Sequence, residues 1–384
     1  MKSEWKTIRA ADFMEFNPRR NLKKGTIATK ISMDKLQPYT KKIPETEQAE
    51  FSGGTKFSNG DTIMARITPC LENGKTAFID CLNKDEVAFG STEFIVLRAK
   101  PGVSDAQFVY YLATSPEFRQ VAIKSMVGSS GRQRVQQPVL ENLELVVPEL
   151  PEQKRIGEFL AAIDDKIALN AKINDNLADL LQTVYQERFG DTSLVANQGS
   201  LYDICSYSRD KVVVSELNVS TYFSTENMLP GKAGSIEATS LPTTPQTTAC
   251  HKGDTLVSNI RPYFKKIVYC EDACGCSADV LCFTPNQPKY SAYLFSTLYA
   301  DKFFAFMVAG SKGTKMPRGD KQQIMTYPVV LPSEEELAGF NTIASPLLEQ
   351  IYSNRAENKR LSILRDTLLP KLMSGEINVS AVQL

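Results

Sequence analysis

The chain has 384 residues, of which 42% are hydrophobic, and its 44 basic and 44 acidic side chains give a formal net charge of zero. This hydrophobic fraction excludes an intrinsically disordered protein, and the length accommodates two or three domains. No run of about 18 apolar residues occurs, so no membrane-spanning helix is expected, and the polar N-terminus lacks the apolar core of a signal peptide. We therefore expect a cytoplasmic protein that does not contact a membrane.

The charge is distributed unevenly along the chain. Residues 1–147 carry 21 basic and 17 acidic side chains, and residues 191–331 carry 13 and 12. The remaining stretches are acidic, with 5 basic and 8 acidic side chains in residues 148–190 and 5 and 7 in residues 332–384. DNA binding requires a basic face rather than a basic total. The zero net charge therefore leaves nucleic-acid binding open for the two mildly basic stretches.

The first 147 residues have the pattern of a mixed domain of short strands and helices. Runs rich in Val, Ile, Thr and Phe alternate with Gly, Pro and Asn turns. Gly60-Asp61 leads into Thr62-Ile63-Met64, which predicts a turn that opens a strand. A helical patch follows at residues 108–112, and a glycine-rich loop at 128–131 precedes a short strand that ends at Pro148.

A long helix is predicted from Glu152 to about Phe189, where no proline and no glycine after Gly157 interrupts the pattern. Its seam residues alternate in steps of four and three, as in a coiled coil. They are Ile163, Ile167, Asn170, Asn174, Leu177, Leu181 and Val184. A second seam lies 184 residues later, at Leu347, Ile351, Asn354, Asn358, Leu361, Arg365 and Leu368. We expect Leu364 to supply the apolar contact that Arg365 cannot provide.

The second half of the chain repeats the landmarks of the first half in the same order. Gly253-Asp254 follows Gly60-Asp61 by 193 residues, and Gly310 follows Gly128 by 182. Three further landmarks recur in the same order: Ile67-Thr68-Pro69 as Ile260-Arg261-Pro262 at an offset of 193, the helical patch as residues 293–298, and Val146-Val147-Pro148 as Val330-Leu331-Pro332 at an offset of 184. A constant order with slowly drifting offsets indicates duplication of a whole domain together with its helix.

If the two helices pack antiparallel, Asn170 lies near Asn358 and Asn174 lies near Asn354. A buried asparagine lowers stability but fixes the register of a coiled coil. The alternative is that these asparagines face solvent and the helices pack elsewhere. The expected fold is α/β (α+β), with two similar globular domains separated by two long helices in an antiparallel coiled coil of pseudo-two-fold symmetry.

The remaining residue types argue against an enzyme. Cys270, Cys274, Cys276 and Cys282 cluster without a pair of Cys-x-x-Cys motifs, so we interpret them as small hydrophobic residues and predict no metal site. Cys250 and His251 are adjacent and point to opposite faces of a strand, which excludes a catalytic pair. The sequence has no Walker loop, no Gly-x-Gly-x-x-Gly and no Asn-Pro-Pro-Tyr motif. We therefore predict no catalytic residue.

The start of the first long helix, Leu150-Pro151-Glu152-Gln153-Lys154-Arg155-Ile156, resembles the specificity subunits of Type I restriction-modification systems. The resemblance extends over the Gly-Asp strands, the glycine-rich loops and the end of the second helix, residues 369–377, and so covers essentially the whole chain. The second helix departs from it at its start, Ser333-Glu334-Glu335-Glu336-Leu337-Ala338. The resemblance assigns residues 1–147 and 191–331 to two target recognition domains, 148–190 to a central spacer helix and 332–384 to a distal spacer helix with a C-terminal tail.

The resemblance also implies the function. Each recognition domain would read one half of a bipartite target in double-stranded DNA, while the helices set the spacer and dock two modification (methyltransferase) subunits through Glu152, Gln153, Lys154 and Arg155. The chain itself would be non-catalytic and bind no cofactor. The modification subunits would bind S-adenosylmethionine, and the restriction (motor-nuclease) subunits would bind ATP and Mg. The complete complex would be an adenine DNA methyltransferase and endonuclease.

A DNA-reading protein needs Lys and Arg for phosphates, and Arg, Asn, Gln, Ser or Thr for base edges. The first domain offers Lys56, Arg66, Lys75, Ser129, Ser130, Arg132, Gln133 and Arg134. The second domain offers Asn259, Arg261, Lys265, Lys266, Lys312, Thr314, Lys315 and Arg318. The alternative for the two glycine-rich loops is an ordinary exposed surface. Tyr263 and Phe264 are expected either to pack on the DNA backbone or to lie in the core.

Two other functions stay open at this stage. The first is an orphan or regulatory specificity subunit, and the second is a coiled-coil scaffold protein without a DNA role. Scaffolding does not require two large duplicated domains with different loops, which favours DNA reading.

Overall fold

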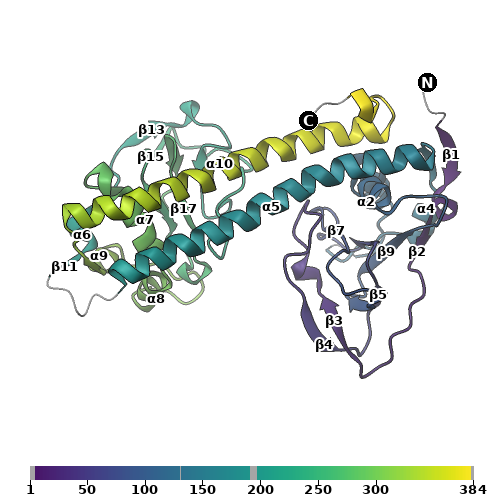
Figure 1. Cartoon of the computed structure of the whole chain (residues 1–384), viewed down its shortest axis with the longest axis horizontal. Coiled ribbons are helices and arrows are strands. Elements are labelled where there is room, and N and C mark those ends of the chain that lie inside the picture. Colours follow the sequence, from purple (N-terminus) through teal and green to yellow (C-terminus); the bar gives the residue numbers. More distant parts are fainter. Residues whose placement is uncertain (1–4, 130, 191–196, 382–384) are drawn as a thin grey trace. The chain divides into compact units, whose positions relative to one another are not determined.

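The computed structural model describes residues 5–129, 131–190 and 197–381. The chain divides into two compact units, unit 1 (Met1–Asn170 with Ala356–Leu384) and unit 2 (Ala171–Arg355). The long helices α5 (Leu150–Phe189) and α10 (Glu334–Met373), drawn in teal and yellow-green in Figure 1, each contribute residues to both units. None of the described helices combines the length and hydrophobicity that a membrane span requires.

Unit 1 contains two four-stranded sheets. The first sheet is antiparallel, in the order β2 (Met14–Phe16), β9 (Phe94–Ala99), β6 (Asp61–Ala65) and β7 (Thr76–Phe78). The second has the order β4 (Glu47–Glu50), β3 (Ile27–Ile31), β8 (Ala88–Gly90) and β5 (Thr55–Phe57). All five residues of β6 are buried, as expected for the strand that Gly60-Asp61 opens.

Short helices cover the first sheet of unit 1. Asp105 caps α2 (Ala106–Thr114) and Ser115 caps α3 (Pro116–Lys124), each through a side-chain oxygen that accepts a backbone N–H. The remaining elements of the unit are β1 (Lys6–Arg9), α1 (Ala10–Phe13), η1 (Met33–Lys35), α4 (Gln137–Glu141), β10 (Glu144–Val147), which pairs with β1, and η5 (Val379–Ala381).

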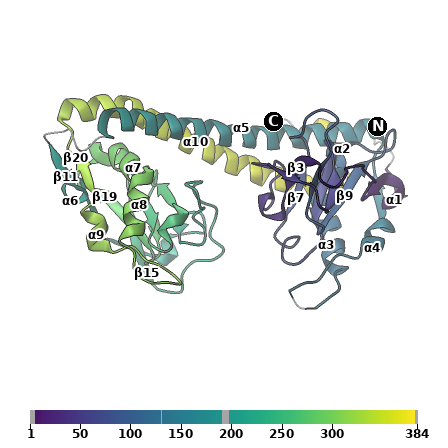
Figure 2. The same ribbon diagram turned by 90° about the horizontal axis from the view of Figure 1, so that it is seen from below.

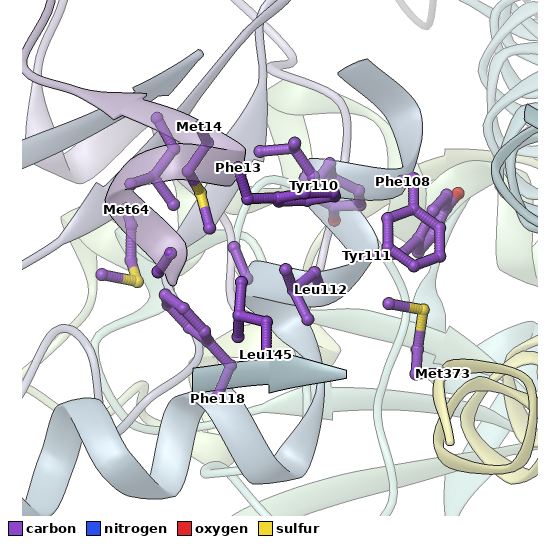
Figure 3. Close-up of a cluster of buried hydrophobic side chains, with 14 of the residues drawn as sticks. Phe13, Met14, Met64, Phe108, Tyr110, Tyr111, Leu112, Phe118, Leu145 and Met373 are labelled. Atoms are coloured by element: carbon purple, nitrogen blue, oxygen red, sulfur yellow. The ribbon is translucent and has the colours of Figure 1, made fainter. Parts of the chain in front are cut away.

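The core of unit 1 is completed by the C-terminal end of the chain. Figure 3 shows Phe108 and Tyr111 of α2 close to Met373 of α10. Leu369 and Leu372 of α10 belong to the same buried cluster. At Gly375, just after α10, φ is +72° and a Cβ atom would lie 2.8 Å from the Trp5 ring, so only glycine fits this position without strain. The first globular domain is therefore closed by residues more than 200 positions away.

Unit 2 repeats this arrangement. Its first sheet has the order β12 (Cys205–Tyr207), β19 (Val280–Pro285), β16 (Thr255–Ser258) and β17 (Ile267–Tyr269). The second has the order β13 (Lys211–Val213), β15 (Gln246–Cys250), β18 (Cys274–Cys276) and β14 (Tyr222–Phe223). The strands β11 (Gln198–Ser200) and β20 (Pro328–Val330) pair beside α6 (Leu201–Ile204) (Figure 2). The remaining helices are η2 (Val214–Glu216), η3 (Pro262–Phe264), η4 (Pro288–Tyr290), α7 (Ser291–Tyr299), α8 (Asp301–Ala309) and α9 (Lys321–Met325).

The second sheets of the two units differ at one edge. Both share three strands, because β3, β8 and β5 pair in the same directions as β14, β18 and β15. The fourth strand of unit 1, β4, pairs with β3, whereas the fourth strand of unit 2, β13, pairs with β15 at the opposite edge. The sequence predicted two similar domains, and the structure shows that they differ in the placement of this outer strand.

The α5 and α10 segments run antiparallel within each unit. In unit 1, the Asn170 amide donates to Oδ1 of Asn358 at 2.9 Å. In unit 2, the Asn354 amide donates to Oδ1 of Asn174 at 2.8 Å. These are the two contacts that the antiparallel packing predicted. Asn170, Asn174 and Asn354 are buried, which contradicts the alternative that they face solvent. Their role in fixing the register stays a prediction.

One prediction about the seam is wrong. Leu364 was expected to replace Arg365 in the seam, but Leu364 is 37% exposed and the Arg365 side chain is only 12% exposed. Nη1 of Arg365 donates to Oδ1 of Asp164 at 2.6 Å, and the Tyr111 hydroxyl donates to Oδ2 of the same carboxylate at 2.6 Å. The seam accommodates an arginine because a buried carboxylate neutralises it.

The corresponding layer of unit 2 is apolar. A shift of 184 residues relates Asp164 to Leu348 and Leu181 to Arg365. Leu181 is 1% exposed and Leu348 is 4% exposed, and both belong to the core of unit 2. Duplication therefore kept the asparagine layers but diversified the layer beyond them.

We predict that Arg365→Leu lowers the free energy of unfolding by about 3–5 kcal/mol, because it leaves the Asp164 carboxylate buried without its cation. The triple variant Tyr111→Phe/Asp164→Leu/Arg365→Leu copies the apolar layer of unit 2 and should return to within about 2 kcal/mol of the wild-type stability. Urea unfolding followed by circular dichroism measures both variants. Equal losses in the single and triple variants would contradict the prediction.

Candidate nucleic-acid interface

The repeated Gly-Asp motif is a turn that opens the central strand of each unit. Oδ2 of Asp61 accepts a hydrogen bond from the backbone N–H of Ser58 at 2.8 Å, and Oδ2 of Asp254 accepts one from the N–H of His251 at 2.8 Å. Both carboxylates are buried. The preceding residues, Gly60 and Gly253, have φ angles of +87° and +90°, which glycine adopts without strain. The turn lies at the start of β6 and of β16, and the glycine-rich loop of each unit pairs with the segment that follows the strand.

At the far end of each strand, the glycine-rich loop forms a short hairpin that pairs with the following segment. In hairpin 1 (residues 127–134), Arg134 forms β-bridges with Val127 and with Ile67. In hairpin 2 (residues 312–318), Arg318 forms β-bridges with Lys312 and with Ile260. The two hairpins are therefore attached at equivalent positions, and hairpin 2 is one residue shorter.

The arginine at the base of each hairpin pairs with a carboxylate that precedes the neighbouring strand. Nε and Nη2 of Arg134 donate to the Glu93 carboxylate at 3.0 and 2.6 Å. Nη2 of Arg318 donates to Oδ1 of Asp279 at 3.1 Å. The hydrogen bond from Arg134 lowers the pKa of Glu93, so this carboxylate is ionised at neutral pH. Nε of Arg66 lies 3.8 Å from the same carboxylate. Sequence analysis selected the arginines but missed both carboxylates.

The predicted tip residues of the hairpins lie at the surface. Ser129 and Arg132 are exposed in hairpin 1, where the N–H of Arg132 donates to the carbonyl of Ser129 at 3.0 Å, and Thr314 and Lys315 are exposed in hairpin 2. Gln133 is half-buried, and Lys312 pairs with Asp320 at 2.7 Å. Ser130 lies outside the described residues. The tips therefore offer basic and hydroxyl groups to a ligand.

Several predicted basic contacts are engaged within their own domains. The ammonium groups of Lys56, Lys75 and Lys266 donate to the backbone carbonyls of Arg20, Met33 and Thr225 at 3.2, 2.9 and 2.5 Å. Lys265 pairs with Asp301 at 3.0 Å. Each of these cations would have to share its hydrogen bonds to contact DNA. Their assignment as DNA contacts stays a prediction.

Asn259 does not lie on the surface. Its side chain is 6% exposed, and its Oδ1 atom has no hydrogen-bond partner among the described residues. The backbone N–H of Asn259 donates to the carbonyl of Asp279, which places the residue under hairpin 2. The prediction that Asn259 contacts DNA directly is therefore not supported.

The segment after Asn259 is strained and exposes two aromatic rings. Arg261 and Lys265 flank η3 with φ angles of +51°, in the left-handed region that non-glycine residues rarely adopt. Tyr263 and Phe264 are 50% and 40% exposed, with ring centroids 4.8 Å apart. The sequence left open whether these rings lie in the core or at the surface, and they lie at the surface.

The predicted partner contacts at the start of α5 divide into two classes. Gln153 is fully buried, and its amide bonds to the N–H of Asp105 and to the carbonyls of Val103 and Pro148. Glu152 is also buried and pairs with Arg155. The prediction of partner contacts is therefore not supported for Gln153 and Glu152, which fix the helix start within unit 1. Lys154 and Arg155 are exposed.

The cysteine cluster is apolar in character. Five cysteines of unit 2 pack together with Met228, Leu256, Val268 and Val280: they are Cys250, Cys270, Cys274, Cys276 and Cys282. Among the described residues, no group of His, Cys, Asp and Glu side chains is arranged to hold a metal ion. Their packing among apolar side chains agrees with the interpretation as small hydrophobic residues, and the absence of a metal site stays a prediction.

Comparison with known proteins shows which proteins the chain resembles. Residues 2–178 match the family described as the Type I restriction modification DNA specificity domain. This part of the chain, just under half of its length, is therefore similar to Type I restriction-modification specificity domains. The specificity subunit of the Type I restriction enzyme EcoAI from Escherichia coli is 38% identical over 104 residues, which cover 27% of this chain and 18% of that protein.

Other relatives extend the similarity over most of the chain. The specificity subunit of the Type I restriction enzyme MjaIX from Methanocaldococcus jannaschii is 22% identical over 305 residues, or 71% of this chain and 69% of that protein. The matches to the EcoAI and EcoEI specificity subunits of Escherichia coli span 18% of the length of each. The S subunit of a Type-I restriction-modification system from M. genitalium shares the fold, with a TM-score of 0.56, 16% identity and 96% coverage of both chains.

The two Gly-Asp turns differ in the side chains that contact the aspartate. In unit 1, Nε and Nη2 of Arg98 each donate to the Asp61 carboxylate at 2.6 Å. In unit 2, the Asp254 carboxylate instead lies 3.2 Å from Sγ of Cys282. Nδ1 of the exposed His251 ring also lies 3.7 Å from Oδ2 of Asp254. Asp61 is therefore paired with an arginine, whereas Asp254 contacts a thiol and an imidazole.

We predict that Asp61→Ala lowers the free energy of unfolding by about 3 kcal/mol, because Arg98 loses its counterion and the turn loses a hydrogen bond. Asp254→Ala should cost about 1–2 kcal/mol, since it removes the turn hydrogen bond, the thiol contact and the contact with the exposed His251 ring but leaves no arginine without its counterion. Thermal unfolding of the two variants provides the comparison. A larger loss for Asp254→Ala would show that the Arg98 pair contributes little.

Proposed function

We propose that the chain is the DNA-reading, non-catalytic subunit of a Type I restriction-modification complex, with each globular domain reading one half of a bipartite target. The observation that carries this proposal is a hairpin with a carboxylate-bound arginine at its base, built twice from duplicated sequence. A protein that reads two different half-sites needs the same supporting backbone structure twice, with different contact residues on each copy. Hairpins 1 and 2 have this property, because their bases match while their tips differ in length and sequence.

The chemistry of the hairpins suits a DNA groove. Exposed Arg132 and Lys315 at the tips provide cations for phosphate oxygens, and Ser129 and Thr314 provide hydroxyl groups. Glycines at the tips, such as Gly131 and Gly313, let the backbone approach a ligand closely. The exposed Tyr263 and Phe264 rings next to Arg261 offer an additional surface for the sugar-phosphate backbone in the second domain.

We assign the remaining roles of the complex from the family. In this proposal α5 and α10 set the spacer between the half-sites, and Lys154 and Arg155 form part of the surface that docks a modification subunit. The modification subunits bind S-adenosylmethionine and the restriction subunits bind ATP and Mg, so this chain binds no cofactor itself. It acts on double-stranded DNA in the cytoplasm.

Selection from a random duplex pool tests the proposal. The full chain, purified with co-expressed modification subunits, should enrich a motif of two short half-sites separated by a spacer of constant length. Mapping of methylated adenines in the host genome should return the same motif. If the protein retains duplexes without sequence preference, DNA reading is contradicted and the scaffold alternative gains support.

We predict that Arg132→Ala weakens binding to all duplexes by a similar factor and reduces the slope of log affinity against log salt by about 1, because a phosphate contact is lost. Filter binding over a range of salt concentrations measures both quantities. Lys84→Ala is the matched control, since exposed Lys84 lies near the Asn59–Leu82 contact at the opposite end of β6. Unchanged affinity, salt dependence and sequence preference in Arg132→Ala would contradict the loop assignment.

A further inference from the structure

We infer that Arg134 and Arg318 are the equivalent base-reading arginines of the two recognition domains, each oriented by a carboxylate, while the hairpin tips contact phosphate. This inference rests on the proposed DNA-reading function. It separates the residues that determine sequence preference from those that provide general affinity, and it adds Glu93 and Asp279 as positioning residues.

The geometry of Arg134 leaves one edge of its guanidinium available. A guanidinium has five N–H donors, arranged so that two adjacent edges can each bind a pair of acceptors. The edge formed by Nε and Nη2 faces Glu93, at 3.0 and 2.6 Å. Among the described residues Nη1 has no hydrogen-bond partner, and the side chain is 42% exposed. The second edge, formed by Nη1 and Nη2, is therefore open to a ligand while the plane of the group is fixed.

This open edge matches guanine. An arginine that binds a base specifically in the major groove donates two parallel hydrogen bonds to O6 and N7 of guanine. A guanidinium held in place by a carboxylate loses less conformational freedom when it binds than a free side chain does. The carboxylate also disfavours a phosphate at this position, because the two negative charges would repel each other. Arg134 is thus suited to a base edge rather than to the DNA backbone.

The second domain repeats the arrangement with different residues. Nη2 of Arg318 donates to Asp279 at 3.1 Å, and its side chain is 54% exposed. The carbonyls of Glu93 and Asp279 accept hydrogen bonds from the N–H groups of Arg66 and Asn259, which occupy matching positions in the repeat. Exposed ion pairs of this kind contribute little to stability. Their recurrence at one point of both platforms therefore indicates a role in binding.

The hairpin tips contrast with their bases. Arg132 and Lys315 are exposed, and neither has a carboxylate partner among the described residues. Long, unrestrained cations of this kind suit phosphate oxygens, which demand charge rather than a fixed plane. Each hairpin thus combines an arginine fixed at its base with a cation that has no carboxylate partner among the described residues at its tip.

The test compares Arg134→Lys, Arg318→Lys and the tip variant Arg132→Lys in the full chain purified with its modification subunits. Lysine keeps the charge at each site but lacks the two-donor edge, so a base contact and a phosphate contact give different results. The probe is the random duplex pool, followed by competition with duplexes that carry single substitutions in the selected motif. Thermal unfolding midpoints confirm that the variants are folded.

Arg134→Lys should reduce discrimination at one guanine of one half-site by roughly 5- to 150-fold and leave the other half-site unchanged. Arg318→Lys should have the same effect in the other half-site. Arg132→Lys should preserve the whole motif. Glu93→Gln should weaken discrimination at the same position as Arg134→Lys without reducing affinity for unrelated duplexes, an outcome that a purely structural ion pair would not give.

Two results would overturn the inference and leave the proposed function standing. One is that Arg134→Lys and Arg318→Lys both select the wild-type motif and discriminate against single substitutions as strongly as the wild type. The other is a uniform loss of affinity for all duplexes in these variants, which would assign the arginines to phosphate. A wild-type protein that selects no motif would overturn both the inference and the proposed function. If Arg134→Lys unfolds unit 1, Arg318→Lys still tests the inference, because the Arg318–Asp279 pair is exposed and its substitution should leave unit 2 folded.

Discussion

The antiparallel packing of α5 against α10 is the interaction on which the rest of the fold depends. In unit 1, Leu369, Leu372 and Met373 of α10 join the first globular domain in one buried cluster. In unit 2, Leu181, Tyr185 and Phe189 of α5 join the second globular domain and Phe340 of α10 in another. Each core therefore needs a helical segment from both halves of the sequence. Loss of the helix pairing would open both cores, because each core would then expose apolar side chains that are covered by a helix from the other half of the sequence.

Duplication preserved the parts of the molecule that position the two hairpins and changed the parts around them. The Gly-Asp turns, the central strands and the bridges at Arg134 and Arg318 recur with the same backbone partners. In contrast, the outer strand of the second sheet changed edges, and the Asp164–Arg365 layer has a leucine pair as its counterpart. Shared hairpin attachments with different surroundings agree with the proposed reading of two different half-sites.

The candidate interface combines rigid and adaptable groups. The fixed plane of Arg134 depends on Glu93, whose carboxylate stays ionised at neutral pH because the guanidinium lowers its pKa. The tip cations have no such restraint and can follow a phosphate backbone of varying geometry. Under the proposed function, this division would let a single loop provide both general affinity and sequence preference. It also explains why the residue types of the loop alone do not reveal which residue has which role.

The sequence by itself determined the two long helices, the Gly-Asp turns and the asparagine pairs, because each follows from local periodicity or from the spacing of a repeat. It also identified Arg134, Arg318 and the exposed tip residues as candidates. Tertiary structure alone decided that Arg365 is neutralised by Asp164, that Gln153 and Asn259 are buried, and that Glu93 and Asp279 hold the two arginines. These contacts join residues from about 40 to 200 positions apart, and a charged or polar side chain gives no sign in the sequence of which distant partner the fold will bring to it.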